Sequence, residues 1–156
     1  QVLNVLAVAG SKVDELLAEI NRVLHKDEVA DAVLVGVGKL GRALLDYGGF
    51  AEENIRFVAA FDIEPAKTQE LAPIPVYAVD EMPGRVGELG ARIAVLAVPA
   101  TEVQKVADLL VLGGVKGFLN FAPARLILPA GCTENQINLA MELEKVVVSV
   151  AGGGSG

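Results

Sequence analysis

The feature that most constrains the fold is a glycine-rich turn between an apolar run at 32–35 and a helix-like stretch. Gly36, Gly38 and Gly41 form the pattern G-x-G-x-x-G. In a strand-turn-helix unit the first glycine permits a tight turn, the second lets backbone approach a diphosphate, and the third lets helix and strand pack closely. Free amides at the helix start favour a bound anion. The turn therefore predicts phosphate contacts from Gly36, Val37, Gly38, Lys39, Leu40 and Gly41.

One acidic residue indicates which phosphate ligand the turn suits. Segment 55–61 is predicted as the second strand, and Asp62 follows it, about 20 residues beyond the last glycine, as a dinucleotide fingerprint requires. Its carboxylate would accept hydrogen bonds from ribose hydroxyls and repel a 2′-phosphate, which favours NAD(H) over NADP(H). The alternative is that Asp62 only begins the turn Asp-Ile-Glu-Pro. The two halves of the motif together favour the binding role.

Composition agrees with a parallel α/β sheet and excludes several functions. Apolar residues make up 53% of the 156 residues and aromatic residues 4%, as in aliphatic sheets covered by helices on both faces. No apolar stretch approaches the roughly 20 residues of a membrane span. The net charge of −7, without a basic cluster, argues against direct nucleic-acid binding.

The rare reactive side chains argue against metal and nucleophilic chemistry. Cys132 is the single cysteine and His25 the single histidine, too few for a metal cage or a Cys/His catalytic pair. A lone thiol cannot form an intrachain disulfide and fits a reducing compartment. We therefore expect a cytoplasmic protein with no metal site and a buried or half-buried Cys132.

Alternating strand-like and helix-like segments predict a Rossmann-like, doubly wound parallel sheet. Apolar spacing predicts one helix over 11–24 and another that begins at the capping-box pair Thr101 and Gln104 and ends at Gly113. Further strands are expected at 74–78, 92–98, 115–120, and 137–139 with 146–150.

The chain is expected to contain a single domain. Residues 11–150 would form the Rossmann-like domain. Residues 1–10 would be an apolar leader or an added strand, and the Gly/Ser-rich residues 151–156 a flexible tail.

Two more turns are predicted on the ligand side, because ligands of such sheets bind beyond the carboxyl ends of the strands. Pro99 and Pro123 would shape backbone beside a cofactor. Asn120 would bond a carboxamide or ribose group, and Phe121 would cover a ring. The alternative is that these residues only form ordinary loops that end the strands, without a role in binding. The candidate contacts of these turns are Val98, Pro99, Asn120, Phe121, Ala122 and Pro123.

Taken together, these residues resemble the C-terminal regulatory domain of the Rex redox-sensing transcriptional repressors. The resemblance implies a homodimer that binds NADH in competition with NAD⁺ and whose winged-helix domains release operator DNA. It also implies that the three glycines and Asp62 hold the dinucleotide. The matching blocks are 36–45 with Tyr47 and Phe50, 60–62, 74–77, 96–100, 117–123 and 140–143.

The chain departs from the family pattern in four places. The winged-helix domain is missing from the sequence, so we expect sensing of NAD(H) without DNA binding. Asn138 stands where the family usually has Asp, which removes a carboxylate suited to linking the Tyr47 region to the DNA-binding part. Segment 68–73 lacks a glycine-containing turn. The exchanged C-terminal helix is missing or replaced by 146–156, so weaker dimerisation is expected.

The expected function is binding without catalysis. Hydride transfer from an alcohol usually needs an acid or base in the cleft, and the sequence offers none there beyond Tyr47. Three alternatives remain: the cofactor half of an NAD-dependent dehydrogenase, a CoA-binding domain of the ligase type, and an engineered scaffold without a ligand. A ligase-type domain normally needs no acidic residue after the second strand, so Asp62 argues against it.

Overall fold

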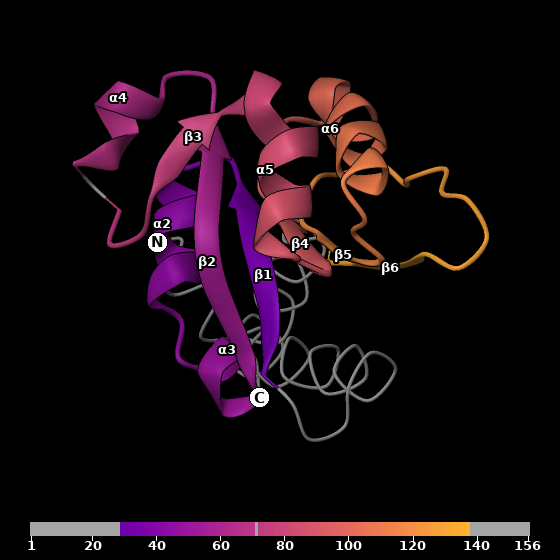
Figure 1. Cartoon of the computed structure of the whole chain (residues 1–156), viewed down its shortest axis with the longest axis horizontal. Helices are drawn as coiled ribbons and strands as arrows, with labels where there is room; N and C mark the ends of the chain where they lie inside the picture. The colour runs from indigo at the N-terminus through magenta and orange to yellow at the C-terminus, as the bar shows by residue number, and fades with distance from the viewer. Residues whose placement is uncertain (1–28, 71, 138–156) are drawn as a thin grey trace, which may run out of the picture.

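A computed structural model describes residues 29–70 and 72–137 (Figure 1). The predicted helix at 11–24, the strand at 146–150, both terminal segments, His25 and Asn138 lie outside the described residues.

Within the described residues the sheet has six parallel strands in the order β3-β2-β1-β4-β5-β6. The order reverses between β1 and β4, which is the topological switch point where this fold class binds its ligands. The predicted Rossmann-like, doubly wound sheet is thus confirmed. The strands are β1 (Ala30–Val35), β2 (Ile55–Asp62), β3 (Val76–Ala78), β4 (Ile93–Leu96), β5 (Gly117–Asn120) and β6 (Thr133–Gln136).

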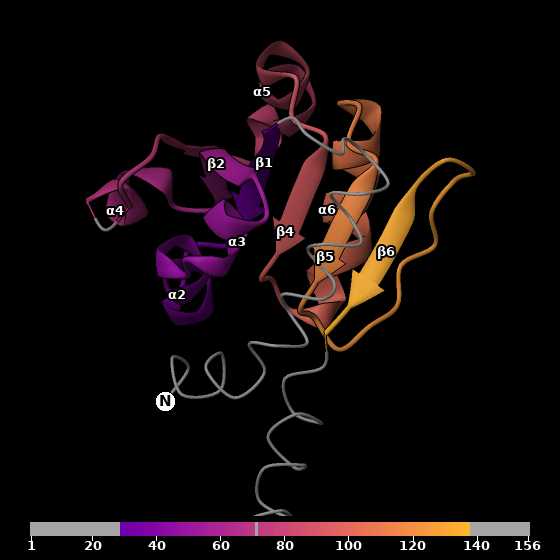
Figure 2. The same ribbon diagram turned by 90° about the horizontal axis from the view of Figure 1, so that it is seen from below.

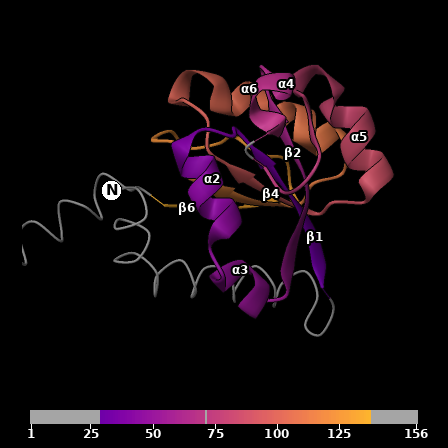
Figure 3. The same ribbon diagram turned by 90° about the vertical axis from the view of Figure 1, so that its left-hand side faces the viewer.

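Helices cover both faces of this sheet (Figures 1 and 3). On one face lie α2 (Lys39–Asp46) and the short α3 (Gly49–Glu52). On the other lie α5 (Met82–Leu89) and α6 (Ala100–Leu112), which contact each other. The chain between β2 and α5 also contains α4 (Pro65–Gln69) and a 3-10 turn, η1 (Val79–Glu81).

The core has two layers because successive strand residues point to opposite faces. In β1, Ala32 and Leu34 pack with the layer under α2 and α3, whereas Val33 and Val35 pack with the layer under α5 and α6. Both sets are fully buried. This two-sided burial explains why the strands are continuous apolar runs rather than alternating ones.

The last described strand, β6 (Thr133–Gln136), was not predicted, because it is a run of four polar residues. The predicted strand at 137–139 lies almost entirely outside the described residues, which end at Ile137. Among the described residues β6 is the last strand of the sheet, and a strand in such a place tolerates polar side chains, so β6 carries no apolar pattern to detect. Ile137, the first residue of the predicted strand, follows β6 and is buried.

The predicted capping box of α6 is also wrong. Pro99 occupies the N-cap position, and no side chain caps the helix. The Gln104 side chain instead bonds the backbone of Ile127 and the carboxylate of Asp108. The predicted end of the helix at Gly113 is confirmed.

Candidate functional site

The glycine turn is built into the sheet at the carboxyl end of β1. Gly36 adopts φ +95°, in the left-handed region that favours glycine. A Cβ on Gly36 would overlap the carbonyl oxygen of Ala97, directly after β4. Its N–H donates to the carbonyl of Phe61 at 2.8 Å. The first glycine therefore lets the turn pass between the ends of β2 and β4.

Gly41 holds helix α2 against the turn. It is buried, and a Cβ there would overlap the carbonyl oxygen of Gly36 and press on the side chain of Leu34. The third glycine thus has the close-packing role that the motif predicts. This contact fixes where the N-terminus of α2 points.

Gly38 has open space where its Cβ would stand. It is the N-cap of α2, it is exposed, and no atom lies within 4 Å of a Cβ built on it. No side chain caps the helix. The N–H groups of Gly38, Lys39 and Leu40 donate to no other residue in the described part of the chain. Such open donors at a helix N-terminus suit an anion.

Asp62 joins the two halves of the fingerprint. Its Oδ2 accepts a hydrogen bond from the Val37 N–H at 2.8 Å, and its Oδ1 accepts one from the Glu64 N–H at 3.1 Å. The second bond is the local turn considered as the alternative role. The first bond holds the carboxylate against the glycine turn, directly before the start of α2.

Ile63 is a surface residue that the sequence reasoning missed. It follows Asp62 directly, and 88% of its surface is exposed. A single exposed apolar residue is common, so its type alone gives no signal. Its place at the carboxyl end of β2 sets it beside the carboxylate that would bind a ribose.

The turn after β4 lies at the same edge of the sheet. Ala97 donates to the Val35 carbonyl at 2.9 Å, which ties this turn to the end of β1. Val98 is half-buried and Pro99 is exposed at the start of α6. The pairing of β1 with β4 thus brings Val98 and Pro99 to the edge that carries the glycine turn.

The turn after β5 is held by side-chain hydrogen bonds. Asn120 is completely buried, and its Nδ2 donates to the carbonyl of Ala124 at 2.7 Å and to Oε2 of Glu134 at 2.8 Å. Its Oδ1 accepts from the N–H of Ala122 at 2.8 Å. Because both amide hydrogens are used inside the protein, Asn120 is an anchor of the loop in this structure, rather than the open donor that was predicted.

The other predicted residues of this turn divide between core and surface. Phe121 and Ala122 are buried, and Phe121 packs in the layer under α2. The Phe121 ring is therefore not exposed to cover a ligand in this structure. Pro123 is exposed. Direct ligand contacts from this turn stay predictions.

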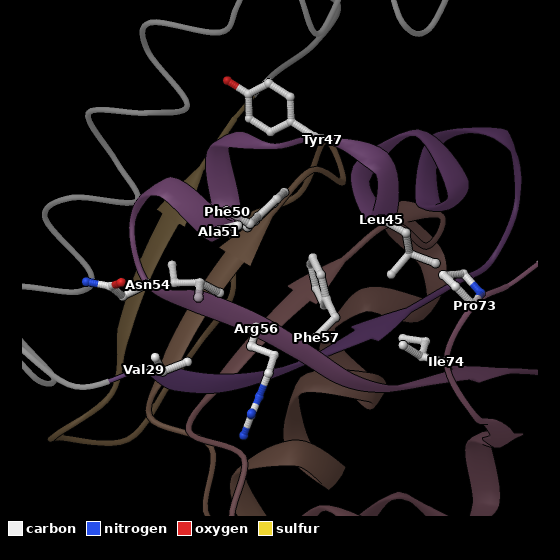
Figure 4. A pocket seen from close by; sticks show the side chains of 11 residues that line it. Val29, Leu45, Tyr47, Phe50, Ala51, Asn54, Arg56, Phe57, Pro73 and Ile74 are labelled. Carbon is white, nitrogen blue, oxygen red and sulfur yellow. The ribbon is translucent and has the colours of Figure 1, made fainter.

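A separate pocket of about 430 Å³ lies at the amino ends of β1 and β2 (Figure 4). Phe50 packs edge to face with Tyr47 and with Phe57, at ring-centroid distances of 5.8 and 4.9 Å. None of the predicted cofactor residues lines this pocket. It is therefore distinct from the glycine-turn site at the carboxyl ends.

Residues 29–70 and 72–137 contain no group of three or more His, Cys, Asp and Glu side chains placed to hold a metal ion. Over the same residues, no helix is long and apolar enough to cross a membrane. Cys132 is half-buried, as predicted, and its Sγ lies 3.7 Å from the Val115 carbonyl oxygen.

Comparison with known proteins gives one matching family model and several relatives of one kind. The family model described as CoA binding domain matches residues 27–124. The redox-sensing transcriptional repressor Rex of a Geobacillus species is 41% identical over 139 residues, covering 88% of this chain and 64% of that protein. Rex of Anoxybacillus flavithermus is 40% identical and covers 88% and 65%. The chain thus spans just under two thirds of these relatives.

Solved structures point the same way. The Rex-family repressor RSP is 26% identical with a TM-score of 0.71, covering 88% of this chain and 66% of that one. RSP in complex with NADH gives a TM-score of 0.73 at the same identity, covering 88% and 67%. RSP in complex with NAD⁺ and operator DNA gives 0.71, covering 88% and 64%. The resemblance to the Rex family is confirmed.

Proposed function

The chain belongs to the CoA binding domain family, and from this premise we propose that it binds NAD(H) as the sensor domain of a Rex-type regulator. The observation that carries the proposal is the bond between the Asp62 carboxylate and the Val37 N–H, at 2.8 Å. It joins the carboxylate proposed to bind ribose to the turn proposed to bind diphosphate. A dinucleotide needs both groups at this spacing.

The residues of the site have the chemistry that a dinucleotide needs. The free N–H groups of Gly38, Lys39 and Leu40 would donate to the diphosphate. Asp62 retains lone pairs for ribose hydroxyls, since each of its oxygens accepts one hydrogen bond within the described residues. The open space at Gly38 admits a ligand close to the backbone.

The name of the family raises CoA as a second candidate ligand. CoA and NAD share an adenosine diphosphate group, and both would use the N-terminus of α2. They differ at the adenosine ribose, where CoA carries a phosphate and NAD has free hydroxyls. A carboxylate at Asp62 favours the hydroxyls and repels the phosphate. The position of Asp62 therefore supports NAD(H).

The wider role follows from the relatives. Those proteins are named redox-sensing repressors, and RSP has been solved with NADH and with NAD⁺ and operator DNA. We propose that this domain reports the NADH/NAD⁺ state as part of a cytoplasmic homodimer, without binding DNA itself and without catalysing a reaction. A DNA-binding partner domain would supply the output.

Replacing Asp62 by Ala is expected to weaken NADH binding roughly 30-fold, since hydrogen bonds to a charged group contribute about 2 kcal/mol. Affinity for NADPH is expected to change little or to improve, because the repulsion of its 2′-phosphate is removed. Calorimetric titration of wild type and variant with NADH, NADPH and CoA measures the affinity for each of the three ligands. Wild-type protein that prefers CoA to NADH would contradict the proposal.

Two further variants sharpen this test. Asp62→Asn keeps an oxygen to accept from Val37 but removes the charge, so it should retain the fold and still lose discrimination against NADPH. Asp46→Ala removes an exposed carboxylate at the far end of α2 and should leave every affinity unchanged. Circular dichroism of each variant checks folding.

Replacing Ile63 by Ser is expected to weaken binding of the adenosine half about threefold to tenfold. The exposed side chain next to Asp62 would lose apolar area that a bound adenine covers. AMP and NADH should be affected by the same factor in equilibrium titrations. Leu112→Ser, at an exposed apolar residue at the C-terminal end of α6, is the control. Equal affinities for wild type and Ile63→Ser would place adenine elsewhere.

A further inference from the structure

The loop that joins β5 to β6 is fixed by side chains of the polar edge strand. Both oxygens of Glu134 lie 3.2 Å from the Leu126 N–H, and Oε2 also accepts from Asn120 Nδ2 at 2.8 Å. Gln136, two residues on, donates its Nε2 to the carbonyl of Ala122 at 3.0 Å. The strand β6 thus holds the loop at its start, through Ala122, and near its middle, through Leu126.

Helix α6 fixes the same loop at a third point. The Gln104 side chain accepts from the Ile127 N–H at 2.8 Å and donates to the Ile127 carbonyl at 2.9 Å. The Ile127 side chain itself is 83% exposed, so apolar packing does not explain why its backbone is held. The loop, which runs between β5 and β6 in Figure 2, is therefore positioned by polar contacts.

Glu134 is the central member of this network. In the parallel register it pairs with Phe118, and Gln136 pairs with Asn120, so all four side chains share one face of the sheet. Asn120 is completely buried, and removing Glu134 would leave one of its amide hydrogens without an acceptor. Buried donors without partners are costly and seldom tolerated. The loop would rearrange to satisfy that donor.

The loop borders one half of the proposed ligand site. A dinucleotide crosses the sheet at the switch point between β1 and β4. Asp62, at the end of β2, takes the adenosine side. The nicotinamide side then lies over the ends of β4 and β5, between the turn at Pro99 and the loop that begins at Asn120.

From this network we infer that Glu134 is a positioning residue for the nicotinamide half of the ligand: it holds Asn120 and Leu126, and with them the wall of the site. The inference rests on the proposed binding of NAD(H). Glu134 touches no ligand group in this account. Its effect is to keep one loop conformation ready, so that binding does not have to order the loop.

The test compares NADH with ADP-ribose, which lacks the nicotinamide ring. Glu134→Ala is expected to weaken NADH binding about tenfold and to change ADP-ribose affinity less than twofold. The ratio of the ADP-ribose dissociation constant to the NADH dissociation constant should therefore fall, because NADH loses the benefit of its ring contact. Glu134→Gln keeps an oxygen that can accept from Asn120 and Leu126, so it should recover most of the wild-type ratio.

Further variants exclude a general loss of structure. Gln136→Ala releases Ala122 from the same strand and should lower the same ratio, which keeps the inference testable if Glu134→Ala does not fold. Glu88→Ala removes an exposed carboxylate of α5 and should leave both affinities unchanged.

Three outcomes would overturn the inference. The ratio could stay at its wild-type value in Glu134→Ala, or both ligands could weaken equally in that variant and in Gln136→Ala. Either result, with wild type binding ADP-ribose and NADH, rejects the role of Glu134 and leaves the proposed function standing. Wild type that binds neither ligand rejects both.

Discussion

Replacing Gly38 by valine is expected to abolish NADH binding, with at least a 100-fold loss of affinity, while the fold survives. No protein atom lies within 4 Å of a Cβ at Gly38, and its φ of −93° is open to any residue. The free space is where the ligand diphosphate would approach the N–H groups of α2. A valine side chain would therefore occupy the space that the ligand needs, without overlapping any protein atom.

Titration calorimetry with NADH measures the loss of affinity, and a thermal melt measures whether the fold survives. Gly48→Val provides a matched control, because Gly48 is also exposed, has no atom within 4 Å of a Cβ, and lies outside the turn. It should bind NADH as wild type does. An unchanged dissociation constant in Gly38→Val would show that the diphosphate does not bind at this turn.

The glycine turn was predictable because its signal is local and physical. A tight turn, a close helix and an open backbone each require glycine, so the spacing of Gly36, Gly38 and Gly41 carries the geometry. The apolar strands were predictable for the same reason: burial on both faces requires continuous aliphatic runs. The structure also shows which of the three glycines the fold itself requires. A side chain at Gly36 or Gly41 would overlap backbone atoms, whereas a side chain at Gly38 would meet no protein atom.

The edge of the sheet was not predictable from the sequence. The polar strand β6 has no apolar period, because its side chains hold a loop and, within the described residues, it pairs with β5 alone. The role of Asn120 was likewise hidden, since a polar residue at a strand end suits both a ligand contact and an anchor. Its acceptor Glu134 lies 14 residues away. Such pairings depend on tertiary contacts that spacing along the chain does not encode.

Replacing Gly41 by alanine is expected to destabilise the whole domain, in contrast to Gly38→Val. In an exposed helix this substitution stabilises by up to about 1 kcal/mol, because alanine is the better helix former. At Gly41 the new Cβ would overlap the carbonyl oxygen of Gly36, and α2 must move away from β1. Forced overpacking of this kind costs about 1–3 kcal/mol or more, so the overlap outweighs the helix propensity.

Urea unfolding followed by circular dichroism gives the free energy of unfolding for each variant. Gly87→Ala is the matched control: it makes the same change in α5, where the nearest atom to the new Cβ is the Gly113 carbonyl oxygen at an ordinary 3.9 Å. The control should be as stable as wild type or more stable, while Gly41→Ala unfolds at lower urea. If both variants were stabilised alike, α2 would not be packed against the turn, and the direction of its free N–H groups would no longer support a diphosphate site.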